Sequence, residues 1–267
     1  MVGAAAEHGA EDGEGRMRVL ILGVSDAFSR RGFGSSALIE APDGYVLVDC
    51  PDPIHRILHE ATAQAGWSVD ASQIDDVLLT HLHGDHCNGL EAFGFARTIA
   101  RMRNPGPKLP RVFTNRPAAE RLWERLAPAM ELQTWLGRPA RLEDYFELHP
   151  LDPDLEVEVS GLRVRCRMTG HPVPTCGFLI SDGTWTLGWS GDTPFDGGLI
   201  DWLSEADLIV HESCEGPVHT PIASLNDLPR EIRARIRLIH FPDDFDASGS
   251  DILPLRAGEV LTVESRR

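Results

Sequence analysis

Residues 80–90 read Thr-His-Leu-His-Gly-Asp-His-Cys-Asn-Gly-Leu and place four candidate metal ligands in one short turn: His81, His83, Asp85 and His86. They follow an apolar strand predicted over residues 76–80 and precede a predicted helix. Imidazole nitrogens and carboxylate oxygens suit zinc and similar divalent metals. Four donors this close cannot converge on one ion without strain, so a tight turn would divide them between two ions. The alternative, a solvated loop with histidines clustered by chance, fits this spacing poorly.

Three further candidate ligands each come at the end of a predicted strand. His171 follows residues 162–168, Asp192 follows residues 185–189, and His240 ends the run Arg-Leu-Ile-His. Binding sites of α/β folds usually form at the carboxyl ends of the strands. We therefore expect these three residues to meet the turn at one edge of the fold.

The pattern His-x-His-x-Asp-His after a strand, followed by these three residues in this order, resembles the metallo-β-lactamase superfamily over about residues 17–262. The resemblance implies an α/β fold, the αββα sandwich of two facing sheets with outer helices. It also implies that one metal ion is held by His81, His83 and His171. A second would be held by Asp85, His86 and His240, and Asp192 would bridge the two.

Such a site predicts a dinuclear metal-dependent hydrolase. Two neighbouring cations that share a water lower its pKa to near neutrality, so the expected nucleophile is a metal-bridging hydroxide. Asp85 is accordingly counted among the catalytic residues as well as the ligands. Zinc is the first choice for the two divalent ions because imidazole dominates the site, while the carboxylates leave manganese or iron open.

The segment from residue 207 to residue 241 is similar to the ribonuclease Z branch, in which a strand ending in His-Glu, a later histidine, a helix and a strand ending in His-Phe recur. This similarity implies that Glu212 and His219 pass a proton to the leaving oxygen. The alternative is that Glu212 only binds backbone at a strand end and that His219 is a loop residue. Only 20 residues separate His171 from Asp192, which leaves no room for that branch's transfer-RNA arm. The prediction is therefore a phosphodiesterase acting on a small phosphodiester.

Two other classes use the same ligands. One is a thioesterase- or lactonase-type ester hydrolase, which would not need an acid at His219. The other is an iron-dependent member that does not hydrolyse its substrate. A scaffold without activity is disfavoured because the set of seven ligands is complete.

Composition indicates one catalytic domain over residues 17–267 after an acidic, glycine-rich tail, residues 1–16, which we expect to be disordered. The chain has 267 residues, of which 42% are hydrophobic, enough for a large core. Its net charge of −16 repels polyanions, so the expected partner is a small-molecule ester and not a long nucleic acid.

One stretch runs against this acidic balance. Residues 97–125 hold eight basic side chains and two glutamates, Glu120 and Glu124. The basic residues are Arg97, Arg101, Arg103, Lys108, Arg111, Arg116, Arg121 and Arg125. We favour an exposed helix-loop-helix face, and the alternative is a rim beside the metals that attracts anions.

The five cysteines are widely spaced, and none forms a Cys-x-x-Cys pair. This usage is typical of a reducing compartment and predicts a cytoplasmic protein. No signal peptide is recognised, and the apolar runs are too short to cross a membrane. The sequence is compatible with a homodimer but does not establish one.

Residue patterns predict helices over residues 53–66, 90–102, 117–130, 199–206 and 228–237. Strands are predicted over residues 18–23, 37–40, 45–49, 112–114, 155–159, 162–168 and 208–210. Residues 134–150 are expected to be a connector.

Overall fold

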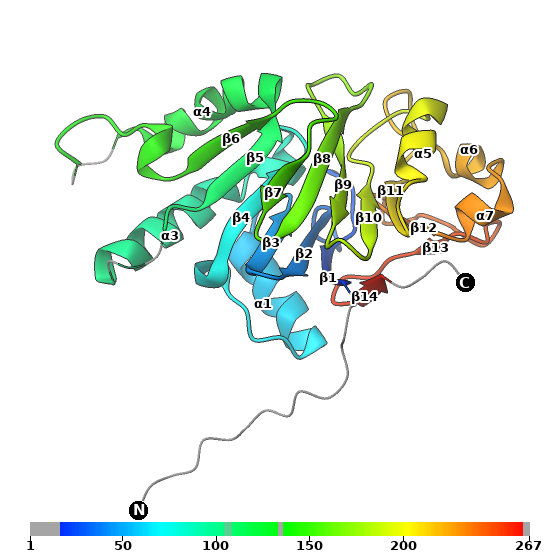
Figure 1. Cartoon of the computed structure of the whole chain (residues 1–267), viewed down its shortest axis with the longest axis horizontal. Helices are drawn as coiled ribbons and strands as arrows, with labels where there is room; N and C mark the ends of the chain where they lie inside the picture. The colour runs from blue at the N-terminus through cyan, green and yellow to red at the C-terminus, as the bar shows by residue number, and fades with distance from the viewer. Residues whose placement is uncertain (1–16, 105, 107, 133–135, 264–267) are drawn as a thin grey trace, which may run out of the picture.

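Two seven-stranded sheets face each other in the computed structural model of the chain, and helices cover their outer faces (Figure 1). The structure describes residues 17–104, 106, 108–132 and 136–263. The predicted tail, residues 1–16, and the last four residues lie outside the described residues. The predicted sandwich of two sheets with outer helices is confirmed.

The first sheet has the order β14-β1-β2-β3-β4-β5-β6. Strands β1 to β3 form an antiparallel meander, and β3 to β6 run parallel. The bounds are β14 (Val260–Val263), β1 (Met17–Gly23), β2 (Ser36–Ala41), β3 (Gly44–Val48), β4 (Ile74–Leu79), β5 (Arg111–Asn115) and β6 (Glu147–Leu151). Its helices are α1 (Ile54–Ala65), α2 (Gly84–Cys87), α3 (Leu90–Arg103) and α4 (Arg116–Met130), with short 3₁₀ turns at Ala71–Gln73 and Leu142–Asp144.

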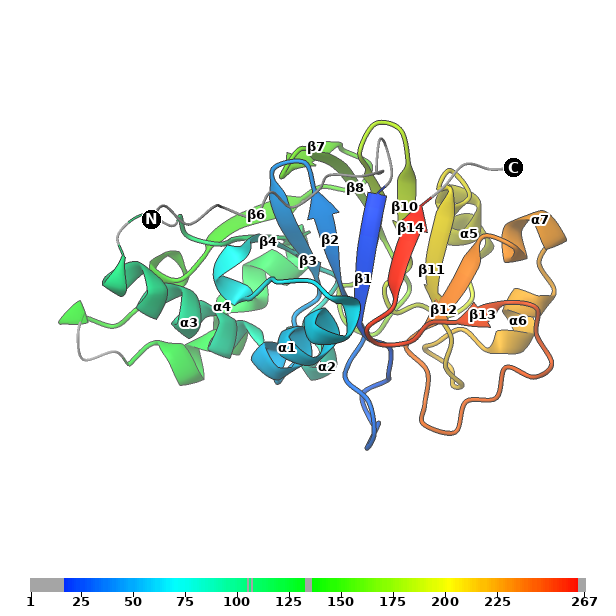
Figure 2. The ribbon, with the colours of Figure 1, turned by 90° about the horizontal axis from the view of Figure 1, so that it is seen from below.

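The second sheet has the order β13-β12-β11-β10-β9-β8-β7. Strands β7 to β10 are antiparallel neighbours, and β10 to β13 run parallel. The bounds are β7 (Val157–Val159), β8 (Leu162–Met168), β9 (Cys176–Ser181), β10 (Thr186–Trp189), β11 (Leu208–Glu212), β12 (Ile236–Ile239) and β13 (Leu253–Pro254). Its helices are α5 (Gly197–Leu203), α6 (Ile222–Asn226) and α7 (Arg230–Arg233). Figure 2 shows α1 to α4 on one side of the paired sheets and α5 to α7 on the other.

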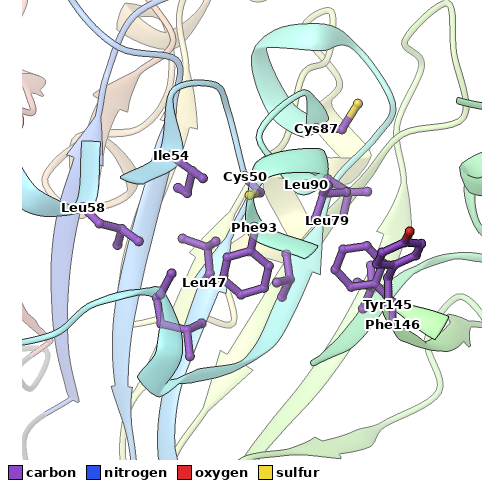
Figure 3. Close-up of a cluster of buried hydrophobic side chains, with 14 of the residues drawn as sticks. Leu47, Cys50, Ile54, Leu58, Leu79, Cys87, Leu90, Phe93, Tyr145 and Phe146 are labelled. Carbon is purple, nitrogen blue, oxygen red and sulfur yellow. The ribbon is translucent and has the colours of Figure 1, made fainter. Parts of the chain in front are cut away.

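The alternation of side chains along β1 explains why both faces of this strand are buried. Val19 and Ile21 belong to the core between the two sheets, whereas Leu20 and Leu22 belong to the core under the helices. In the helix-side core, Phe93 of α3 lies near Leu47 of β3 (Figure 3). These cores fix the sheets, and with them the strand ends that carry the candidate ligands.

Two predicted elements are wrong. The connector expected at residues 134–150 contains the start of β6. Pro150 makes this segment look unlike a strand, but β6 lies at the edge of the sheet, where proline is tolerated. The helix expected at residues 228–237 is reduced to the single turn α7, and the chain then enters β12. Strand β9 was not predicted, while the hairpin of β7 and β8 is confirmed.

Among the described residues, no helix is both long enough and apolar enough to cross a membrane.

Candidate active site

The candidate ligand turn connects β4 to α2 as predicted. His83 has an extended backbone and immediately precedes α2, and its carbonyl accepts hydrogen bonds from the backbone N–H groups of His86 and Cys87 at 3.1 and 3.0 Å. The turn is therefore tight enough to aim its donors in two directions.

All seven predicted ligands come together at the carboxyl ends of the strands. His81, His83, His171 and Asp192 offer donor atoms that lie within 4.8 Å of one another, and Asp85, His86 and His240 form a second such group. The Asp192 carboxylate lies between the groups: Oδ2 is 3.7 Å from His81 Nε2 and 3.5 Å from His240 Nε2, and Oδ1 is 3.4 Å from His86 Nε2. The donor atoms are thus grouped as the family resemblance implies, and their role as metal ligands stays a prediction.

Unpartnered nitrogens show that this site fits metal ions. Within the described part of the chain, His81 Nε2 and His86 Nε2 are buried without a hydrogen-bond partner. A buried polar atom without a partner is costly, and a cation would remove that cost. Two histidines also face each other through His83 Nδ1 and His171 Nε2, 3.1 Å apart. Neutral imidazoles and carboxylates are the donors that zinc and related ions prefer.

The opposite ring nitrogens are held by the protein. Thr80 Oγ1 donates to the Asp49 carboxylate and can therefore accept a bond from His81 Nδ1, 3.0 Å away. The Val218 carbonyl accepts from His171 Nδ1 at 3.2 Å. Such contacts fix the tautomer and leave the other nitrogen free for a metal.

Asp49 is a residue of the candidate site that the sequence did not single out. It follows β3, is fully buried, and accepts a hydrogen bond from His86 Nδ1 at 2.8 Å. It also accepts from the backbone N–H of Thr80 at 2.8 Å. One carboxylate thus orients both His86 and the start of the ligand turn. The available signal was a charged residue that ends an otherwise apolar strand.

Burial and charge set the pKa values of the ligands. Burial lowers the pKa of His81, His83 and His171, which keeps these rings neutral and able to bind a metal. Burial raises the pKa of Asp85, but the hydrogen bond with His240 and the nearby charge of His86 outweigh it and hold that pKa far below its usual range.

The histidines of the second group respond in the opposite way. Burial lowers the pKa of His86 and of His240, but nearby carboxylates together outweigh burial, so that both pKa values are raised. Asp192 acts on both rings, Asp49 also acts on His86, and Asp85 also acts on His240. The raised pKa favours the protonated form of these two rings, and a cation bound at their ring nitrogens would displace that proton.

Glu212 and His219 form a pair beside the ligands. His219 Nδ1 donates to Glu212 Oε1 at 2.9 Å, and the ring of His219 stacks on that of His240 with centroids 5.2 Å apart. Glu212 is buried and also accepts from the backbone N–H of Thr193 at 2.8 Å. Burial lowers the pKa of His219, but the hydrogen bond to Glu212 and its charge outweigh burial and raise it. His219 also lies close enough to Asp192 and His240 to form a third possible ligand group with them.

The basic segment is not one exposed face, so the favoured interpretation is wrong for part of it. Arg97 is buried and bound to the Ser72 carbonyl and to Asp75, and Arg111 binds Asp76. Arg121 and Arg125, in contrast, line a hollow that includes His83. These last two residues lie where the alternative, a rim beside the metals that attracts anions, would place them, and attraction of anions stays a prediction.

Comparison with known proteins gives one family match. A family model described as Anti-Pycsar protein Apyc1 matches residues 17–252. An Anti-Pycsar protein Apyc1 of Paenibacillus sp. (strain J14) is 31% identical over 92% of this chain and 99% of the relative. The cAMP/cGMP-dependent 3′,5′-cAMP/cGMP phosphodiesterase B of Dictyostelium discoideum is 25% identical over 72% of this chain, which corresponds to 18% of that protein.

Solved structures share the fold. The metallo-β-lactamase fold protein YhfI from Bacillus subtilis has a TM-score of 0.73 at 18% identity, covering 92% of this chain and 99% of YhfI. The short form of human tRNase Z has a TM-score of 0.65 at 17% identity, covering 93% and 100%. The predicted metallo-β-lactamase fold is confirmed.

Proposed function

Because the chain belongs to the Anti-Pycsar protein Apyc1 family, we propose that it hydrolyses small cyclic nucleotides. The predicted class, a metal-dependent phosphodiesterase of the metallo-β-lactamase fold, is confirmed by its relatives. The name of the Dictyostelium relative supports a 3′,5′-cyclic nucleotide as the substrate. The observation that carries the proposal is the Glu212–His219 pair beside the donor cluster, because a phosphodiester needs an acid for its poor leaving group.

The donor set fits two divalent ions, with zinc as the first choice and manganese or iron still open. His81, His83 and His171 would hold one, Asp85, His86 and His240 the other, and Asp192 would be shared between them. The chemistry that such ions supply when bound is activation of water and neutralisation of charge on phosphate oxygens.

His219 is placed to hold the proton that the departing ribose oxygen needs. Its raised pKa favours the protonated ring near neutral pH, as a general acid requires. Glu212 fixes the ring through Nδ1 and directs the remaining N–H away from itself. A thioester expels a thiolate, which leaves without a proton, so this pair favours phosphodiesters over the thioester alternative.

Three further predictions from the sequence accompany this function. A cytoplasmic location agrees with the five free cysteines, of which Cys50, Cys87, Cys166 and Cys176 are buried. The absence of binding to long nucleic acid follows from the net charge of −16. A homodimer is compatible with the sequence and is tested by measuring the mass in solution.

The direct test is to supply zinc or manganese to the purified protein and to offer it cyclic AMP, cyclic GMP and bis(p-nitrophenyl) phosphate. We expect hydrolysis of all three, with two ions bound per chain. His83→Ala and Asp192→Ala should each abolish hydrolysis and lower the metal content, while His59→Ala, an exposed histidine on α1, should change neither. Full activity with one ion or none, or no hydrolysis of any cyclic nucleotide, would contradict the proposal.

A further inference from the structure

A hollow of about 460 Å³ opens beside the candidate ligands, between the ligand turn, α4 and the loop that follows His171. His83 forms part of its wall. This volume falls within the range of small-ligand pockets, roughly 300–1,000 Å³. A substrate whose phosphate lies on the donor cluster would therefore extend its next group into this hollow.

The walls of this hollow differ in chemistry. Leu82, Val173 and Pro174 provide apolar surface, whereas Arg121 and Glu124 provide charged groups. Nucleobases are bound in such surroundings because their faces pack on apolar side chains and their edges form hydrogen bonds. The hollow thus has the two kinds of surface that a base requires.

Arg121 and Glu124 lie one turn apart on the same side of α4, with the Arg121 Nε atom 3.6 Å from Glu124 Oε2. The side chains are 66% and 73% exposed, so they are free to turn toward a ligand. The wall beside them is held in place because Arg125 donates to Asn88 Oδ1 at 2.6 Å, linking α4 to the end of α2.

A second hollow lies on the Asp85 side of the cluster, and it suits a base less well. Its aromatic side chain, Phe33, is already covered by the guanidinium of Arg56, 5.5 Å from the ring centroid. The remainder of that lining is rich in charged residues, including Arg30, Arg31, Asp26 and Asp52.

We propose that the hollow beside His83 binds the nucleobase of the substrate and that Glu124 makes the site prefer guanine. This inference rests on the proposed cyclic-nucleotide activity. A carboxylate has only acceptors. Guanine offers it two adjacent N–H donors, N1–H and the 2-amino group, and its O6 acceptor beside them faces Arg121. Adenine offers the carboxylate only the 6-amino group, so it forms one such bond where guanine forms two.

The test is Glu124→Gln, with Glu120→Gln as the matched control. Glu120 is exposed on the same helix but does not line the hollow. A glutamine keeps the size of the side chain but presents an amide N–H₂ to one of the guanine donors. We expect KM for cyclic GMP to rise about ten-fold with little change in kcat, and KM for cyclic AMP to rise less than about three-fold. The control should retain both wild-type values.

Binding supplies a readout that does not depend on turnover. Calorimetric titration of the metal-loaded protein with a non-hydrolysable phosphorothioate analogue of cyclic GMP should show the same loss of affinity in Glu124→Gln and none in Glu120→Gln. If the wild-type protein hydrolyses both nucleotides and the variant leaves the cyclic GMP to cyclic AMP ratio unchanged, the inference fails while the proposed function stands. If the wild-type protein hydrolyses bis(p-nitrophenyl) phosphate but neither nucleotide, the proposed function fails and the inference fails with it.

Discussion

Removing the imidazole of His219 tests whether this residue is an acid, a ligand or a structural residue. In His219→Ala, the buried carboxylate of Glu212 loses the partner that lies 2.9 Å away, and the leaving oxygen loses its proton donor. If His219 is the acid, the loss must depend on how much the leaving group needs a proton.

The expected magnitude follows from the usual contribution of general acid catalysis, roughly 10²- to 10⁴-fold. This range corresponds to about 3–5 kcal/mol of transition-state stabilisation. Cyclic AMP should show the whole loss because a ribose oxygen departs. Bis(p-nitrophenyl) phosphate should lose much less, because p-nitrophenolate leaves without a proton.

The assay compares kcat for the two substrates and measures bound metal in each variant. Glu212→Gln is the companion variant: its amide oxygen can still accept from the Thr193 N–H, but the charge that raises the pKa of His219 is gone. We expect it to lose roughly 10- to 100-fold on cyclic AMP. His59→Ala is the matched histidine control.

Two results would refute the reasoning. Equal losses on both substrates with unchanged metal content would remove His219 from proton transfer. A fall in bound metal in His219→Ala would instead assign it to the ligand group that it can form with Asp192 and His240.

Three further outcomes are expected. Asp49→Asn should weaken zinc binding roughly 10- to 100-fold in a chelator competition, because the carboxylate that orients His86 through Nδ1 is lost. The control is Asp76→Asn, since Asp76 is an equally buried carboxylate that binds Arg111. This control should lower stability and leave zinc affinity unchanged. Burial lowers the pKa of His211 to about 4. Because the folded pKa lies below the unfolded value of about 6.5, this histidine's contribution is present above pH 6.5 and is lost as pH falls toward 4. Urea titrations measure the free energy of unfolding at each pH. Between pH 6.5 and pH 4 this free energy should fall by about 3 kcal/mol more in the wild type than in His211→Asn. Parallel curves of the free energy of unfolding against pH for the two proteins would contradict this. Phe93→Ala should cost about 3–5 kcal/mol in the same assay because Phe93 is fully buried (Figure 3), and Phe28→Ala, which removes an 88% exposed ring, should cost less than about 0.5 kcal/mol.

The sequence was sufficient to predict that the candidate ligands lie together, because their placement depends on one local turn and on strand ends. His81 and His83 need only one tight turn, and His171, Asp192 and His240 need only strands that end on the same edge. The elements that were missed have ambiguous local patterns. Leu228, Ile232 and Ile236 recur every four residues as on a helix, yet Ile236 begins β12, because the parallel partner β11 provides hydrogen bonds that a local pattern cannot reveal.

Asp49 and Asp76 show where reasoning from sequence stops. Both are acidic residues beside apolar runs of the first sheet, and both are completely buried. Asp76 lies at the start of β4, where Arg111 and Ser160 neutralise and bind it, at the sheet edge opposite to the candidate ligands. Asp49 follows the end of β3, beside the point where β4 delivers Thr80 and the ligand turn. Since β3 and β4 run parallel, one carboxylate orients a candidate ligand while the other only stabilises the sheet. The direction of a neighbouring strand therefore decides which buried aspartate acts on the site, and that direction is set by tertiary structure.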